Sequence, residues 1–229
     1  GVAPRAPRTG RSTRVGAHAR EPRGSSRRRR RHRDRATRSR TSGGPGRVRA
    51  PAPASPARRW LPGAAVAAVA VFLVLGTHDR YGGWNDTSRL GMAEAIVEHG
   101  RLYLDGTEMG RKSGDVCMID GRYYSDKPPA VALLAVPVYA TEVELGLRFR
   151  TDLPRAYYWT TLLTIGLTTV LGLIVLARFL VRIVPDPRWR ALTVLGLGLG
   201  SLNTAYSITF SNHPPSAMML LVGLLSLWS

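Results

Sequence analysis

The sequence predicts an all-α multi-pass membrane protein with about four transmembrane helices, interfacial helices in a large outer loop and a disordered basic tail. Two observations support this. Residues 1–59 hold nineteen Arg and only two acids, a net charge of +17, which leaves +1 of the chain's +18 to residues 60–229. Apolar runs close to the length of a membrane span then recur after residue 60. A charged tail and an apolar domain are therefore joined in one chain.

The tail, residues 1–58, is rich in Arg, Pro, Gly and Ser and has almost no large apolar side chains. Such a segment cannot bury enough surface to offset its ordering entropy, so we expect it to be disordered. The run Arg27–Arg31 could bind nucleic acid by charge, but no aromatic residues are interleaved to stack on bases. We expect a cytoplasmic tail that contacts acidic lipid headgroups, and no nucleic acid partner.

Four apolar segments are predicted to span a cell membrane, with the N-terminus on the cytoplasmic side. The segments are Trp60–Thr77, Tyr157–Leu180, Trp189 to about Tyr206, and Ser216–Ser229. The chain begins with Gly1, and its last apolar run is still unfinished at Ser229. We therefore expect an incomplete transmembrane domain, residues 59–229, from the N-terminal part of a longer protein.

The first outer loop, about residues 78–156, is too polar to cross a bilayer. Helical spacing of apolar residues predicts an amphipathic helix over Thr87–His99 that lies on the membrane surface, and Gly100 ends it. Asp86 or Thr87 is expected to cap its start.

Two Asp-Gly pairs follow, Asp105-Gly106 and Asp120-Gly121, and predict hairpin turns. The apolar run Pro128–Ala140 is too short to span, so we expect a second interfacial or re-entrant helix there.

Three polar positions are candidates for chemistry. Asp86, just past the first predicted span, suits a general base or a metal-binding carboxylate, and equally a helix cap. Lys127, in Asp126-Lys127-Pro128-Pro129, is placed to hold a phosphate, with help from Arg122 and Arg89; otherwise these charges lie among headgroups.

The third position is Asn212-His213, in a predicted outer turn. A His beside an Asn at a helix start can serve as a metal ligand or an acid/base partner, or can belong to a polar turn without a role. Taken alone, the polar turn is the better interpretation.

Together these residues resemble the GT-C glycosyltransferases, such as the protein O-mannosyltransferases and the aminoarabinose transferases. The resemblance covers roughly residues 60–229. It rests on Asp86, on the amphipathic segment Ser88–His99, on Tyr124-Ser125-Asp126-Lys127-Pro128-Pro129, and on the turn Ser211–Pro215.

The resemblance implies a membrane enzyme that moves a sugar from a polyprenyl-phosphate donor to a lipid, glycan or protein acceptor outside the cytoplasm. By position Asp86 would be the catalytic base or would hold a divalent metal. The substrate-binding residues would be Arg89, Arg122, Asp126, Lys127, Asn212 and His213.

Two departures affect the metal: Thr87 stands where many relatives have a second acid, and Asn212-His213 stands where many have an acid in the later turn. The alternative function is a non-catalytic multi-pass protein, a transporter or an assembly subunit, although ionisable residues at mid-bilayer depth are not evident.

Overall fold

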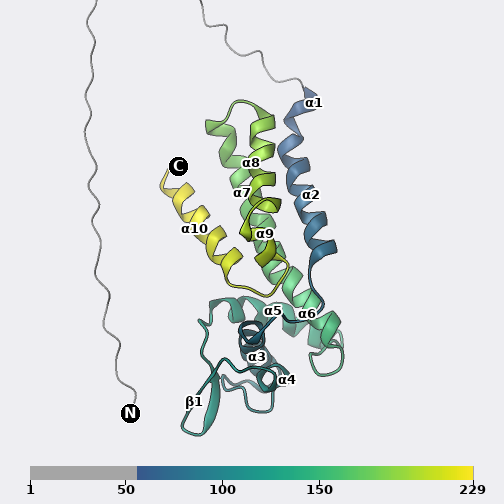
Figure 1. Ribbon diagram of the computed structural model, residues 1–229, viewed down its shortest axis with the longest axis vertical. Coiled ribbons are helices and arrows are strands. Elements are labelled where there is room, and N and C mark those ends of the chain that lie inside the picture. The colour runs from purple at the N-terminus through teal and green to yellow at the C-terminus, as the bar shows by residue number, and fades with distance from the viewer. Residues whose placement is uncertain (1–55, 229) are drawn as a thin grey trace, which may run out of the picture. The chain divides into compact units, whose positions relative to one another are not determined.

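The structure, a computed structural model, describes residues 56–228 (Figure 1). The predicted tail lies outside the described residues, apart from its last three, which belong to the first helix. The α-helices are α1 (Pro56–Arg59), α2 (Leu61–Gly76), α3 (Trp84–His99), α4 (Glu108–Arg111), α5 (Ala130–Glu144), α6 (Leu153–Thr161), α7 (Leu167–Ile183), α8 (Pro187–Leu199), α9 (Leu202–Ser207) and α10 (His213–Leu227). A π-helical turn, η1 (Leu162–Gly166), joins α6 to α7, and strands β1 (Val116–Ile119) and β2 (Arg122–Ser125) form a hairpin.

The helices fall into two groups. In the first, α2, α7 and α8 pack side by side with α10 against α7, which we call the helical bundle (Figure 1). In the second, α3 is surrounded by α4, α5 and the hairpin, which we call the α3 region. The continuous helix α6–η1–α7 belongs to both groups, because its first turns pack against α5 and its last turns pack against α2 and α8.

The prediction of an all-α protein with about four transmembrane helices is wrong for the described residues. Only Leu153–Ile183, with 31 residues, is long and apolar enough to cross a membrane. A bilayer core about 30 Å thick needs roughly 20 helical residues, whereas α2 has 16 and α10 has 15. One such helix does not establish a multi-pass protein, because a buried core helix meets the same criteria.

The third predicted span is interrupted. Helix α8 ends after 13 residues, and Ser201 begins the short helix α9 by accepting a hydrogen bond on its side chain from the backbone N–H of Asn203. This is ordinary N-capping, which hydropathy does not detect. The hairpin is a further departure from an all-α fold.

Helix α3 is also different from its prediction as a surface helix. Ten consecutive residues, Asp86–Ala95, are buried, so no face of this stretch is left for solvent or headgroups. The charged side chains Arg89 and Glu94, expected on an exposed face, are only 6% and 3% exposed. Helix α3 is therefore the central helix of its region, and the amphipathic interpretation was wrong because its charges have buried partners.

The ends of α3 are partly as predicted. Gly100 terminates the helix in the left-handed conformation, at φ +62°, which confirms the predicted stop. The start is one turn earlier than predicted, with Gly83 as the N-cap, so neither Asp86 nor Thr87 caps the helix. Asp86 instead lies within the first helical turn, where a negative charge is favoured by the helix dipole.

The hairpin confirms the turn predicted at Asp120-Gly121. Strands β1 and β2 pair antiparallel with Ile119 opposite Arg122, and both turn residues have positive φ, as in a type I′ turn. The other pair, Asp105-Gly106, also turns, with Gly106 at φ +77°, but it leads into α4 rather than joining two strands.

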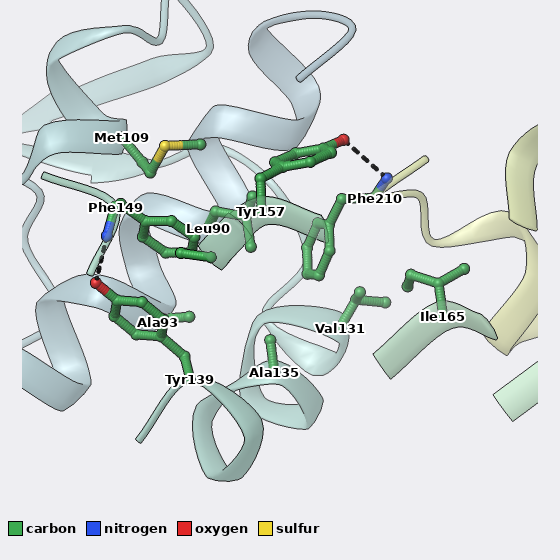
Figure 2. Packing of buried hydrophobic residues seen from close by; sticks show 11 residues of the cluster. Leu90, Ala93, Met109, Val131, Ala135, Tyr139, Phe149, Tyr157, Ile165 and Phe210 are labelled. Atoms are coloured by element: carbon green, nitrogen blue, oxygen red, sulfur yellow. Dashed lines mark hydrogen bonds between the residues drawn. The ribbon is translucent and has the colours of Figure 1, made fainter. Parts of the chain in front are cut away.

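Helix α5 extends beyond the predicted segment and continues through Pro137 to Glu144. It packs against α3, and its buried residues join the core that Figure 2 shows around Leu90. In that core the rings of Tyr139 and Phe149 stack at 4.1 Å between centroids. The Tyr139 hydroxyl accepts a hydrogen bond from the backbone N–H of Phe149 at 3.2 Å (Figure 2). This contact holds the loop after α5 against the helix.

A buried carboxyl group joins α5 to the long helix. Glu142 is 4% exposed, and the hydroxyl of Thr160 lies 3.0 and 3.1 Å from its two carboxylate oxygens. Burial raises the pKa of Glu142 to about 8, because the charged form loses its hydration. The folded protein therefore holds this carboxyl group protonated at neutral pH.

One glycine allows a close contact between α8 and α2 in the bundle. A Cβ atom at Gly198 in α8 would lie 2.6 Å from Cγ2 of Val69 in α2, a side chain that is fully buried. At Gly196, on the same helix, an added Cβ would meet nothing within 4 Å. Of Gly196, Gly198 and Gly200, Gly198 is the one against the neighbouring helix, since Gly200 faces its own helix at Gly196.

The two positions give a matched pair of substitutions. Gly198→Ala should lower the free energy of unfolding by about 1–3 kcal/mol, because the added methyl group overpacks the contact with Val69. Gly196→Ala should raise it by about 0.5–1 kcal/mol, because alanine restricts the unfolded chain and has open space. Urea unfolding in detergent micelles measures both, and equal effects at the two sites would contradict the packing.

The buried carboxyl group predicts a pH dependence of stability. Since the pKa of Glu142 rises from 4.5 to about 8 on folding, stability should fall as pH rises between these values, by up to about 1.4 kcal/mol per pH unit. Glu142→Gln stays neutral and keeps an acceptor for Thr160, so this variant should lose that slope. The stability of this variant should still fall with rising pH up to about pH 7, with a smaller slope than in wild type, since burial raises the pKa of Glu94 to about 7. Urea unfolding from pH 5 to 9 is the measurement, and an unchanged slope would exclude the buried acid.

Candidate functional site

Five of the seven predicted site residues line one pocket of about 390 Å³. They come from three separate segments of the chain: the first turns of α3, the segment before α5, and the turn at the start of α10. The predicted residues in the lining are Asp86, Arg89, Lys127, Asn212 and His213. Asn85, Tyr206, Thr209 and Ser211 complete it, and we call this the α3–α10 pocket.

Asp86 is held at the edge of the core. Its Oδ2 atom accepts hydrogen bonds from the backbone N–H of Gly82 at 2.9 Å and from the hydroxyl of Tyr157 at 3.1 Å. Burial raises the pKa of Asp86 above its ordinary value, although both hydrogen bonds and the charge of Arg89 act in the opposite direction. A carboxylate with a raised pKa is a better proton acceptor than one in water.

Tyr157 connects Asp86 to the far side of the pocket. Besides donating to Asp86, its hydroxyl accepts a hydrogen bond from the backbone N–H of Phe210 at 3.1 Å (Figure 2). Tyr157 is fully buried. Its sequence context, between Ala156 and Tyr158, carries no signal that would have identified this contact.

Arg89 has hydrogen-bond donors to spare. The residue is 6% exposed, and its two Nη atoms donate to the backbone oxygen of Asn85 and to Oδ1 of Asn212, both at 3.1 Å. Within residues 56–228, Arg89 Nε is buried with no hydrogen-bond partner. Burial lowers the pKa of this group, and the carboxylates Asp86 and Asp126 partly restore it. A buried cation with unused donors suits an anionic ligand.

Lys127 is more strongly engaged than the sequence indicated. Its Nζ atom lies 3.1 Å from Oδ2 of Asp115 and 3.3 Å from the carboxylate of Asp126. These hydrogen bonds, first that to Asp115, raise the pKa of Lys127. Asp115 was not predicted to take part, because it stands 12 residues earlier in an irregular loop. Lys127 can therefore contact a ligand only while its Nζ atom is also paired with the carboxylates of Asp115 and Asp126.

His213 begins helix α10, and its ring centroid lies 4.4 Å from that of Tyr206. The side chain of Ser211 accepts a hydrogen bond from the backbone N–H of His213 at 3.3 Å, which holds the turn. The hydrogen bond from Arg89 to Asn212 fixes the same turn to α3. The pair Asn212-His213 is therefore more than an isolated polar turn.

The two remaining predicted residues are not in the pocket lining. Arg122 lies on β2, with its guanidinium carbon 4.4 Å from the ring centroid of Tyr103. Asp126 takes part indirectly, through its ion pair with Lys127. The hairpin turns Arg122 toward Tyr103, which its spacing from Lys127 in sequence does not reveal.

The suggested metal role of Asp86 gains no support from its surroundings. In the described part of the chain, no group of three or more His, Cys, Asp or Glu side chains is placed to hold a metal ion. The Oδ2 atom of Asp86 is already occupied by two hydrogen-bond donors. The residues around Asp86 therefore do not fit a divalent cation.

The arrangement combines a buried carboxyl group, a guanidinium group with spare donors, a shared ammonium group and an imidazole in one pocket. Such a set can take up a proton and compensate a developing negative charge within the same small volume.

Comparison of the chain with protein-family models, curated proteins and solved structures found no match. The functional interpretation therefore rests on the residues of the α3–α10 pocket and on their geometry.

Proposed function

We propose that this protein is a glycosyltransferase that moves a sugar from a polyprenyl-phosphate donor to an acceptor hydroxyl, with the reaction in the α3–α10 pocket. The proposal follows the family that the sequence resembles. The enzyme would work at the surface of a cell membrane, and Leu153–Ile183 is the one candidate for a membrane-crossing helix among the described residues.

The observation that carries the proposal is the convergence of residues distant in sequence. Asp86, Lys127 and His213 were selected separately, from positions spread over more than a hundred residues, and they line the same pocket. A chance set of polar residues on three segments has no reason to meet in one concavity. Pockets of this size with a few convergent polar groups are the usual form of binding sites.

The proposed reaction is a direct displacement at the anomeric carbon. The acceptor oxygen forms a bond to that carbon while the bond from the carbon to the phosphate oxygen breaks, and the phosphate leaves with the electron pair. Asp86 takes the proton of the acceptor hydroxyl, helped by its raised pKa. Arg89, with unpartnered Nε, and Lys127 compensate the charge on the departing phosphate.

The alternative is a non-catalytic membrane protein that binds a polar ligand in the same pocket. The hydrogen bonds of Asp86 favour it, because a carboxylate bonded to Gly82 and Tyr157 is also a good structural link between α3 and the long helix. A substitution that keeps these hydrogen bonds but removes the base distinguishes the two functions.

Asp86→Asn is that substitution. An amide oxygen still accepts hydrogen bonds but is not a base, so sugar transfer should fall by about a hundredfold or more. The assay uses protein in lipid vesicles with a panel of radiolabelled polyprenyl-phosphate hexoses and pentoses. Asp79→Asn, at an exposed carboxylate outside the pocket, is the control and should keep the wild-type rate. Wild-type transfer by Asp86→Asn would mean that Asp86 is only structural.

Arg89→Lys tests the phosphate contact. Lysine keeps the charge but cannot reproduce the planar fork of donors, so the KM for the donor should rise about tenfold. Lys127→Ala should raise it less, because Lys127 is shared with two carboxylates. Arg148→Lys, which alters a partly exposed arginine paired with Glu98, is the matched control. Thermal midpoints of all variants are measured alongside, and an equal rise in KM for Arg148→Lys would argue against a phosphate site at Arg89.

A further inference from the structure

A second pocket, of about 450 Å³, lies between α4 and the hairpin, and nothing derived above assigns it a role. We call it the hairpin pocket. Its lining consists of Leu104, Asp105, Gly106, Gly110, Arg111, Ser113, Val116 and Tyr123. Leu104 is buried at its base, whereas the ring of Tyr123 is 48% exposed.

The lining combines one accessible aromatic ring with polar groups of both kinds. Tyr123 offers a ring face, whose negative quadrupole attracts the C–H groups of a flat apolar surface. Asp105 offers carboxylate oxygens as acceptors and Arg111 offers donors, while the hydroxyl of Ser113, which donates its proton to the backbone oxygen of Trp84, can add an acceptor. A pyranose or furanose ring has an apolar C–H face and a rim of hydroxyl groups that donate and accept, so this lining matches a carbohydrate.

The charges favour a neutral ligand. Asp105 and Arg111 have opposite signs, and Arg111 forms an ion pair with Glu108. A phosphate would meet the carboxylate of Asp105, and an amine would meet the guanidinium of Arg111. Neither sign of ligand charge is favoured, in contrast to the α3–α10 pocket with its spare guanidinium donors.

The walls are held in place before any ligand binds. The backbone N–H of Leu104 donates to the oxygen of Tyr123 at 2.7 Å, and the backbone N–H of Tyr123 donates to Oδ2 of Asp105 at 3.1 Å. On the other side, the buried carboxylate of Glu94 accepts from the backbone N–H groups of Glu108 and Met109 at 2.7 and 2.8 Å, which fixes α4. Such preorganisation lowers the entropy cost of binding.

One segment of the chain, residues 113–116, contacts residues of both pockets. Ser113 and Val116 line the hairpin pocket, while Asp115 between them forms an ion pair with Lys127 of the α3–α10 pocket. Ser113 also donates to the backbone oxygen of Trp84, next to Asn85 in the α3–α10 lining. Neighbouring Cα atoms are about 3.8 Å apart, so the linings of the two pockets approach each other to within the length of a few linked sugar rings.

From these observations we infer that the hairpin pocket binds a neutral sugar unit of the acceptor, so that the acceptor is a glycan whose reacting hydroxyl extends into the α3–α10 pocket. This assignment of the acceptor rests on the proposed function. The binding of carbohydrate to the hairpin pocket does not, because it needs neither Asp86 nor a donor.

The test is equilibrium binding to the full chain in lipid nanodiscs, with a panel of neutral oligosaccharides of two to six hexose or pentose units. Tyr123→Ala should weaken binding at least tenfold, and Asp105→Asn several-fold, through loss of the ring face and of the charged acceptor. Ile119→Ala and Asp120→Asn, at exposed positions on the same hairpin outside the lining, are the matched controls and should bind within twofold of wild type. Hydrogen exchange of the backbone N–H groups of β1 and β2 checks that each variant keeps the hairpin.

The outcomes separate the two proposals. Asp86→Asn should bind the oligosaccharide as wild type does, even where transfer is lost, and Tyr123→Ala should raise the KM for the acceptor while leaving that for the donor unchanged. Failure of wild type to bind any member of the panel, or equal binding by Tyr123→Ala, would overturn the hairpin pocket as a carbohydrate site. Normal transfer by Asp86→Asn with intact oligosaccharide binding would instead overturn the proposed catalytic role alone.

Discussion

The hydrogen-bond chain from Gly82 through Asp86 and Tyr157 to Phe210 is the interaction on which the α3–α10 pocket depends. It connects the start of α3, the first turns of the long helix and the loop before α10. Asp86, Tyr157 and Phe210 are buried, and buried polar groups are costly unless they are paired. These hydrogen bonds therefore fix three segments at once, and loss of Tyr157 leaves the backbone N–H of Phe210 without this acceptor and Asp86 without this donor.

The cost of burying unpaired polar groups also explains how α3 can be the central helix of its region. A helix with Arg89 and Glu94 on it can enter a core only if each charge finds partners there. Glu94 finds them at the start of α4, and Arg89 finds them at Asn85 and Asn212. These contacts position both pockets: Glu94 holds a wall of the hairpin pocket, while Arg89 supplies donors to the α3–α10 pocket. Structural and functional demands are thus met by one helix.

Local patterns in the sequence were sufficient to predict those features that depend only on residues close together in the chain. The Asp120-Gly121 turn and the stop at Gly100 depend on backbone conformations that these residues adopt easily, and both are present. Asp86, Lys127 and Asn212-His213 were each selected as polar positions beside apolar segments, and they line one pocket. Arg122 was expected with them but lies on the hairpin beside Tyr103, because the strand pairing directs it there.

The sequence by itself determined which segments become helices and where the backbone must turn, since propensity, capping and glycine act over a few residues. It did not determine the length of each helix, because a competing contact can end a helix early. The number of predicted spans was therefore too high: Ser201 caps a new helix inside an apolar segment that was predicted to be one span. Only the tertiary structure decided that α3 is buried, that Tyr157 donates a hydrogen bond to Asp86 and that Asp115 forms an ion pair with Lys127. These are pairings between distant residues, and their energies depend on geometry that no local pattern records.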